Sequence, residues 1–352
     1  MKLSSYTKSL LDDIERRIDP ETEEDFHAQW EAFFSDKCKD LVFNPVRKNR
    51  SAPGIELKPI NISDALEDYD LMLADQMNAV SKRLNSKSCS LAIRSNYGTG
   101  IMTSLFGAEI FVMPKKYNTL PTTRSFNDTD KMREIVDAGI PNLNNGWGKH
   151  VFNFGEWCKE VFRDYPKISK YVEFYHPDTQ GPLDITELLW GGEMFYELYD
   201  DPDFVHQTID LMTNTYIKFL DRWFDLYPHR DGINAHWEYF MQGNIMLRND
   251  SAINLSPEQY REFVMPYDKK LLDYYGSGAV HYCGKGDHFI AEMAKLDNLT
   301  GINLSQPHLN DMDKVYAAAF SNNKKILKLQ AEFALDYAKR PDALPGMIYS
   351  EI

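Results

Sequence analysis

The chain has 352 residues, of which 43% are hydrophobic and 26% are charged, a composition typical of a globular protein with one large domain or two small ones. Its 53 aspartate and glutamate residues outnumber 39 lysine and arginine residues, and the net charge of −14 argues against a nucleic-acid-binding protein. We expect a cytoplasmic protein, because four cysteines without a CxxC pair fit a reduced compartment and no stretch predicts a signal peptide or a transmembrane helix.

The first part of the chain predicts helices. The stretch "DFHAQWEAFFSD" places four aromatic residues on one helical face, at Phe26, Trp30, Phe33 and Phe34. A second helical stretch, "SDALEDYDLMLADQMNAVSKRL", follows a link rich in proline and asparagine. Between the two, the basic run "VRKNR" at 46–50 predicts a solvated loop. We therefore expect residues 1–87 to form a helical segment that packs on a main domain formed by residues 88–352.

From residue 88 onward, short apolar runs alternate with helical segments. Eight of these runs predict strands, at 91–96, 108–113, 171–176, 232–240, 278–283, 300–305, 325–330 and 346–352. The clearest helix begins after Ser256, which with Pro257 and Gln259 has the pattern of a capping box. Alternating strands and helices predict a parallel sheet closed into a (β/α)8 TIM barrel with an N-terminal helical extension. The alternative, an open doubly wound sheet, is disfavoured because no glycine-rich dinucleotide fingerprint follows the first strand.

The candidate site residues stand at the ends of the predicted strands. In a barrel, the reactive groups lie at the C-terminal ends of the strands. Eight residues at these strand ends are expected to bind substrate or cofactor, and three of them lie in the loop "HPDTQGP" (176–182). They are Asn96, Tyr97, His176, Asp178, Gln180, Gly284, Ser305 and Gln330.

One pair of side chains in "AVHYCGKGDHF" predicts a metal site. His281 and Cys283 are two positions apart on a predicted strand, so both side chains project from the same face. An imidazole nitrogen and a thiolate so placed suit zinc. His236 and Glu238 share a face in the same way, and Glu238 is a candidate third ligand or general base. The alternative interpretation is that the histidine and cysteine are ordinary pocket lining and that Glu238 pairs with a basic neighbour.

Two long segments resemble the uroporphyrinogen decarboxylase superfamily. They are "DTQGPLDITELLWGGEMFYELYDDPDFVHQTIDLMTNTYIKFL" and "NLSPEQYREFVMPYDKKLLDYYGSGAVHYCG", and the resemblance covers roughly residues 90–330, in the same order. It implies a single (β/α)8 barrel with the site at its C-terminal mouth.

The superfamily's two branches differ in their motifs. The decarboxylases open with an arginine-rich segment that binds substrate carboxylates, whereas the corresponding segment of this chain, "LAIRSNYGTGIM", keeps only Arg94. The decarboxylases also carry a pocket aspartate, and this chain has "HWEYF" at that place. The zinc-dependent methyltransferases of corrinoid systems carry His-x-Cys-Gly, which His281, Cys283 and Gly284 match, and a later cysteine, which this chain lacks. Met347 stands near that position. Glu238, Glu332 or Glu351 would then supply the third ligand, with Glu238 preferred. The end at Ile352 raises the expectation that the last barrel helix is absent from this chain.

The resemblance implies a zinc-dependent methyltransferase that moves a methyl group between a small methylated substrate or thiol and a corrinoid presented by a partner protein. Glu238, His236 and Arg94 are its candidate catalytic residues. One alternative is a tetrapyrrole decarboxylase in which Arg94 and Arg124 grip carboxylates. Another is a non-catalytic barrel that binds a corrinoid. We expect neither nucleic-acid nor membrane partners.

Overall fold

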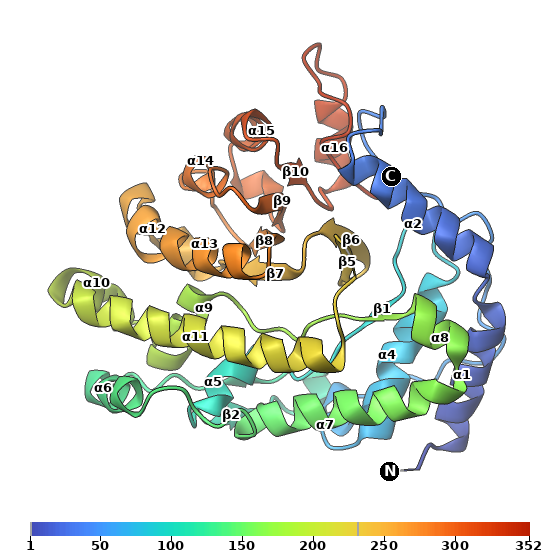
Figure 1. Ribbon diagram of the computed structural model, residues 1–352, viewed down its shortest axis with the longest axis horizontal. Coiled ribbons are helices and arrows are strands. Elements are labelled where there is room, and N and C mark those ends of the chain that lie inside the picture. The colour runs from blue at the N-terminus through green and yellow to red at the C-terminus, as the bar shows by residue number, and fades with distance from the viewer. Residues whose placement is uncertain (1, 231) are drawn as a thin grey trace.

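The N-terminal helices lie along one side of the molecule, with the C-terminus beside α2 (Figure 1). The computed structural model describes residues 2–230 and 232–352. Its first helices are α1 (Ser5–Arg17), α2 (Pro20–Phe34), α3 (Ile62–Ala65) and α4 (Tyr69–Arg83). The side chain of Ser4 caps α1 and that of Asp68 caps α4. Leu10, Leu11 and Ile14 of α1 are fully buried in the same apolar core as Leu73 and Met77 of α4, so the two helices share one interface.

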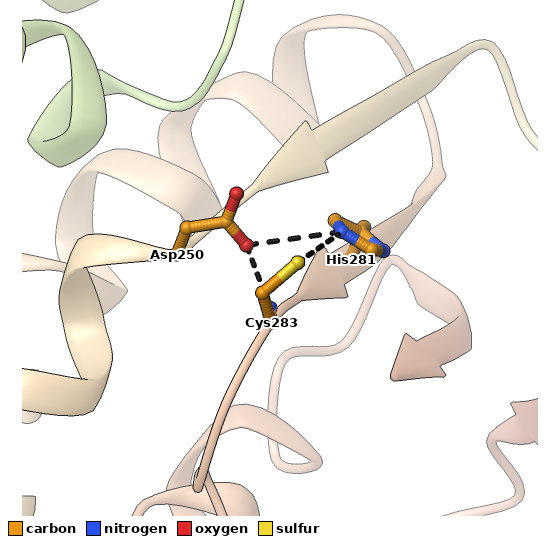
Figure 2. A group of neighbouring side chains, drawn as sticks. All are labelled: Asp250, His281 and Cys283. Carbon is orange, nitrogen blue, oxygen red and sulfur yellow. Dashed lines mark hydrogen bonds and ion pairs between the residues drawn. The ribbon is translucent and has the colours of Figure 1, made fainter. Parts of the chain in front are cut away.

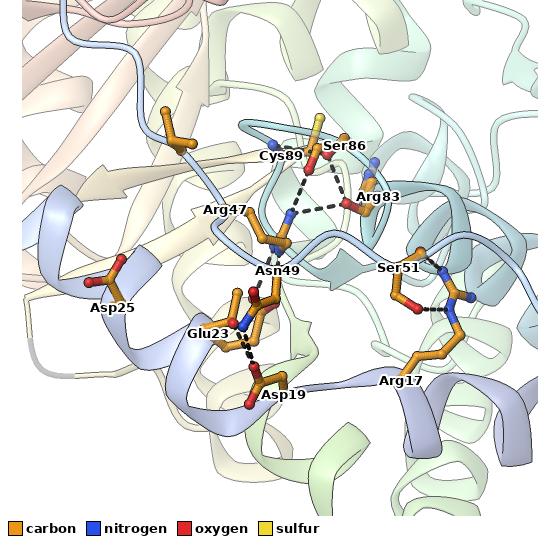
Figure 3. Close-up of polar contacts among 12 residues, drawn as sticks. Arg17, Asp19, Glu23, Asp25, Arg47, Asn49, Ser51, Arg83, Ser86 and Cys89 are labelled. Atoms are coloured by element: carbon orange, nitrogen blue, oxygen red, sulfur yellow. Dashed lines mark hydrogen bonds and ion pairs between the residues drawn. The ribbon is translucent and has the colours of Figure 1, made fainter.

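A buried ion pair holds the segment after α2 (Figure 3). Arg47 is 1% exposed, and its Nε and Nη2 lie 2.8 and 3.0 Å from the two carboxylate oxygens of Glu23. Its Nη1 donates to the carbonyl of Arg83 at 3.0 Å. The expectation of a solvated loop at 46–50 is therefore wrong for Arg47, although Lys48 and the next two residues are exposed. A planar guanidinium can be buried here because acceptors surround it.

Parallel strands form the centre of the structure. β7 (Ile245–Arg248), β8 (Gly278–Tyr282), β9 (Leu299–Leu304) and β10 (Lys325–Ile326) pair in the order β10-β9-β8-β7. A second parallel pair joins β1 (Ala92–Ile93) to β4 (Glu173–Phe174). Parallel bridges also link Ile326 to Ile348 and Phe43 to Tyr349, where the last strand was expected. Mixed α/β content and parallel strands are consistent with a TIM barrel, but the pairings of the described strands do not close into one ring.

Two of the predicted strands belong to antiparallel hairpins instead. The run 232–240 turns at Trp237 and Glu238, so that β5 (Ile233–His236) pairs antiparallel with β6 (Tyr239–Gln242). The run 108–113 contains β2 (Ile110–Phe111), which pairs with β3 (Thr122–Thr123). The prediction missed β7, which follows the hairpin. The turn at Trp237 has a left-handed φ of 55°, and no glycine or asparagine marks it in the sequence.

Helices surround the parallel sheet (Figure 1). The other helices are α5 (Ile101–Leu105), α6 (Thr129–Ala138), α7 (Gly146–Val161), α8 (Pro166–Tyr171), α9 (Pro182–Trp190), α10 (Met194–Asp200), α11 (Pro202–Leu226), α12 (Pro257–Phe263), α13 (Met265–Tyr274), α14 (Ile290–Met293), α15 (Met312–Ser321) and α16 (Ala331–Tyr337), with short 3-10 turns η1 (Lys115–Tyr117), η2 (Phe162–Asp164), η3 (Ser251–Asn254) and η4 (Pro307–Leu309). The capping box at Ser256 and Gln259 is confirmed, and Pro266 stands at the start of α13, where a new helix begins. In the described part of the chain, we find no helix with the length and apolar character needed to span a membrane.

Candidate metal centre

Three potential ligands meet where β7 and β8 end (Figure 2). Asp250 follows β7, His281 lies on β8 and Cys283 follows β8, and one ligand atom from each lies within 4.8 Å of the others. Nε2 of His281 is 3.4 Å from Sγ of Cys283 and 3.7 Å from Oδ1 of Asp250. One nitrogen, one sulfur and one oxygen donor are a set that zinc accepts, and three protein ligands are the usual number in catalytic zinc sites.

Asn303 on β9 fixes the orientation of His281. The side-chain NH2 of Asn303 donates to the carbonyl of Leu327 at 2.6 Å, and its Oδ1 lies 2.6 Å from Nδ1 of His281. Because a backbone carbonyl can only accept, the amide oxygen faces the imidazole and the Nδ1–H must donate to it. The proton of the neutral ring is thereby held on Nδ1. The lone pair of Nε2 is left for a metal.

Asp184 and Cys283 fix the position of Asp250. The buried carboxylate of Asp184, on α9, accepts from the backbone N–H of Asp250 at 2.9 Å and of Ser251 at 2.8 Å. Burial and the neighbouring Asp250 carboxylate raise the pKa of Asp184 well above its usual range. Asp250 in turn accepts from the backbone N–H of Cys283 at 2.6 Å. The two strand ends are therefore connected before any ion binds.

Burial also sets the protonation of the two other ligands. It lowers the pKa of His281, which favours the neutral imidazole that metals bind. Burial raises the pKa of the Cys283 thiol, with Asp250 adding to the effect. A metal that binds here must therefore displace the thiol proton, which makes metal uptake dependent on pH.

A cavity of about 370 Å³ is lined by one of the three candidate ligands, His281. Its lining includes His281 and two of the expected binding residues, Ser305 and Gln330, both of which are exposed. Oγ of Ser305 lies 3.4 Å from Sγ of Cys283. The cavity is large enough for a small molecule, and a molecule bound in it would lie beside His281.

Residues 191–326 match the family model of uroporphyrinogen decarboxylase (URO-D). The match supports membership of the URO-D superfamily. This superfamily of enzymes includes both decarboxylases and corrinoid methyltransferases, and the matched segment contains Asp250, His281 and Cys283. No curated protein shows significant similarity to the chain.

Glu238 lies in the cavity wall rather than beside the histidine and cysteine. It forms a close ion pair with Lys328, and its other oxygen lies 4.0 Å from Nη2 of Arg83. Among the described residues, the ligand group contains Asp250 in the place expected for Glu238. The reason is the hairpin, because the antiparallel turn of β5 into β6 leaves Glu238 in a turn rather than at the end of a parallel strand. Glu351 likewise points to Lys328, at 3.9 Å.

Several expected site residues form a buried polar network instead. Asp178 lies between Arg94 and Arg248, at 3.3 and 3.0 Å. Burial opposes its ionisation, but the two arginines hold the pKa of Asp178 below its usual range. Gln180 donates to the same carboxylate, and Asn96 accepts from Nε of Arg94 at 2.8 Å.

The two histidines expected from the third and fourth predicted strands are also buried in this network. Nε2 of His176 accepts from the backbone N–H of Met246 at 3.0 Å, and burial lowers its pKa to about 4. Nε2 of His236 lies 3.1 Å from Nη2 of Arg248, and burial holds the pKa of His236 well below its usual range. Both imidazoles are therefore neutral near pH 7. Their ring contacts and burial suit a structural role.

The remaining predicted residues lie in different surroundings. Tyr97 is fully buried in the core, with its ring 5.0 Å from that of Trp147, so the expectation that it binds substrate is not supported. Arg124 is 58% exposed and pairs with Glu109 on the β2–β3 hairpin. Gly284 has a φ of 82°, and a Cβ there would lie 2.9 Å from Ile253. Its backbone N–H donates to Gln306 rather than facing open space.

Sequence reasoning missed Asp250, Asn303 and Asp184. The signal for Asp250 was present, since "NIMLRND" is an apolar run that ends in polar residues just before the Ser256 helix cap. Asn303 lies within the correctly predicted strand 300–305, two positions before Ser305. Nothing in the sequence around Asp184 distinguishes it from an ordinary residue of the first turn of a helix.

Proposed function

We propose that this protein is a zinc-dependent methyltransferase of a corrinoid-linked system. The observation that carries the proposal is the grouping of Asp250, His281 and Cys283 at the ends of two adjacent parallel strands, inside the segment matched by the URO-D model. The donor set fits zinc, as do the hydrogen bonds by which Asn303 orients His281 and Asp184 holds the backbone of Asp250.

The residues of the chain divide the work among them. His281 would hold zinc through Nε2 of a neutral imidazole, because Asn303 keeps the proton on Nδ1. Cys283 would hold it as a thiolate, and Asp250 as a carboxylate whose backbone is fixed by Asp184. Zinc at this site would supply Lewis acidity, which lowers the pKa of a substrate thiol and so favours the thiolate that takes the methyl group from the corrinoid. The cavity beside His281 positions the small substrate.

We assign Arg94 and His236 to a supporting network rather than to contact with substrate. The Asp178 carboxylate binds both Arg94 and Arg248, and Arg248 contacts His236. This network contacts the hairpin turn at Trp237, whose ring is 5.1 Å from the Arg248 guanidinium and 4.8 Å from the ring of His236. We assign these residues to positioning Trp237, which lines the cavity. The decarboxylase alternative receives less support, because Arg94 is already paired and Arg124 lies on an exposed hairpin.

A corrinoid protein is the proposed partner that supplies or receives the methyl group. The cavity of about 370 Å³ accommodates a small substrate, which leaves a corrinoid to be presented from outside the mouth.

The first test is the metal content of freshly purified protein, by elemental analysis, with Cys283→Ser as control. We expect about one zinc per chain, lost in the variant. The zinc-loaded protein should then transfer the methyl group of methylcobalamin to 2-mercaptoethanol, and a chelator should abolish the transfer. Absence of metal from both proteins, or transfer unaffected by the chelator, would refute the proposal.

A further inference from the structure

Four charged side chains of alternating sign form a row of ion pairs, and the central two, Glu238 and Lys328, line the cavity. Arg83 lies 4.0 Å from Glu238, Glu238 forms a close ion pair with Lys328, and Lys328 lies 3.9 Å from Glu351. The side chains of Glu238 and Lys328 are each 29% exposed, and both border the cavity that also contains His281. The four charges sum to zero. The cavity wall therefore offers a site without net charge, with one cationic group, Lys328, and one anionic group, Glu238.

Backbone strain is concentrated at the same place. Seven non-glycine residues in the described part of the chain have positive φ, and four of these are aspartate or asparagine, which tolerate it. The other three are Gln180, Trp237 and Lys328. Trp237 (φ 55°) and Lys328 (φ 52°) both line the cavity. A bulky side chain in this conformation is an outlier that clusters at functional sites.

The strained turns place both side chains against the candidate metal ligand and its neighbours. The ring of Trp237 stands edge-on to that of His281, with centroids 5.0 Å apart. The turn at Lys328 brings its ammonium onto Glu238, which is the residue after Trp237. Two separate strand ends are therefore bent to assemble an aromatic wall beside the imidazole and a charge pair in the wall of the same cavity.

We propose that this cavity binds a small zwitterion of the α-amino-acid class, with its carboxylate on Lys328 and its ammonium on Glu238. The inference rests on the proposed function, because the third substituent of such a ligand would reach toward His281. An ion of one sign would break the Lys328–Glu238 pair and leave one half-buried charge without a partner, which is costly. A zwitterion replaces both partners at once. Trp237 and Tyr239 provide the apolar wall for its side chain.

The test compares three ligands that share a propyl chain by isothermal titration calorimetry. 2-Aminobutyrate carries both charges, propylamine only the ammonium and butyrate only the carboxylate. We expect 2-aminobutyrate to bind at least about tenfold more tightly than either, since each pole contributes on the order of one ion pair. Lys328→Asn should abolish the preference over propylamine, and Glu238→Gln the preference over butyrate. Asparagine is chosen because it tolerates the left-handed backbone at this position.

The matched control is Lys269→Met, which removes an exposed lysine from the Lys269–Asp273 pair on α13 and should leave all three affinities unchanged. Equal binding of the three ligands, or a preference that survives both cavity variants, would overturn the inference. None of the ligands contains a thiol, so the titrations need no metal. If the protein binds zinc but does not prefer 2-aminobutyrate over propylamine and butyrate, only this inference is refuted. If it prefers 2-aminobutyrate but binds no zinc, only the proposed function is refuted.

Discussion

The imidazole of His281 and the side-chain amide of Asn303 are in direct contact, with Nδ1 and Oδ1 2.6 Å apart. The contact sets which ring nitrogen carries the proton, because the other end of the amide is held by the Leu327 carbonyl. A residue that would not itself bind the metal is thus expected to determine how well the site binds it.

We therefore expect Asn303→Ala to weaken zinc binding by about 10- to 100-fold, measured by competition with a chromophoric chelator. Without its partner, the ring of His281 is free to rotate and to place its proton on Nε2. Asn322→Ala is the matched control, since Asn322 also donates to a backbone carbonyl but is exposed at the C-terminal end of α15. Equal zinc affinity of the two variants would contradict the orienting role of Asn303.

Asp250 and Glu238 are alternative candidates for the third metal ligand, and substituting each of them distinguishes the two. Asp250 lies within 4.8 Å of the His281 and Cys283 ligand atoms, whereas Glu238 is bound to Lys328. Asp250→Asn should lower zinc affinity by at least about tenfold, because an amide is a much weaker zinc ligand than a carboxylate. Glu238→Gln should leave the zinc affinity within about twofold of the wild type. The reverse order of effects would restore Glu238 as the ligand.

The sequence was sufficient for the local features and insufficient for the arrangement between strands. His281 and Cys283 were placed correctly because a two-residue spacing on one strand fixes which face they share. The helix at Ser256 was recognised because its cap is built from three neighbouring residues. Glu238 was misplaced because the turn at Trp237 requires a backbone conformation that tryptophan rarely adopts, and its sequence therefore reads as a continuous strand.

Asp250 was missed for a related reason. Once residues 232–240 are read as one parallel strand, β7 becomes an unassigned linker and its polar end has no place in the barrel. The pairing of β7 with β8 places Arg248 opposite His281 and brings Asp250 to Cys283. Such a pairing depends on contacts between distant residues, which a single sequence does not reveal.

The Arg47–Glu23 pair makes a prediction about stability. Both side chains are buried, so Glu23→Ala leaves a guanidinium without its counter-charge and should lower the free energy of unfolding by about 3 to 5 kcal/mol. The neighbouring Lys48–Asp25 pair is the matched control, because Lys48 is 66% exposed, and Asp25→Ala should cost less than about 1 kcal/mol. Urea denaturation measures both. Equal losses would show that burial does not distinguish the pairs.

Asp268 makes a prediction about the pH dependence of stability. Its side chain on α13 is fully buried, and its Oδ2 accepts from Asn249 at 2.6 Å. In the described part of the chain, its Oδ1 has no hydrogen-bond partner. Burial raises the pKa of Asp268 from 3.8 to about 7. Between about pH 4 and pH 7, the folded protein therefore keeps a proton on Asp268 that the unfolded chain has already released.

The sign follows from this difference in bound protons. Within this pH window, the unfolded state binds fewer protons than the folded state. The contribution of Asp268 to the free energy of unfolding therefore falls as the pH rises, until the folded carboxyl ionises near pH 7. Asp268→Asn keeps an acceptor for Asn249 and removes the ionisation. The variant should be more stable than the wild type at pH 8, by up to about 4 kcal/mol, with a smaller advantage at pH 5.5.

Urea denaturation at the two pH values measures the gap between variant and wild type. Asp273→Asn provides the control on the same helix, because a hydrogen bond from Lys269 lowers the pKa of the exposed Asp273. Asp273 is ionised in both the folded and the unfolded protein at pH 5.5 and at pH 8. The difference in stability between Asp273→Asn and the wild type should therefore be the same at the two pH values. An equal gap at pH 5.5 and pH 8 for Asp268→Asn would mean that the Asp268 carboxyl ionises normally in the folded protein, and that Asn249 is held by a carboxylate rather than by a protonated acid.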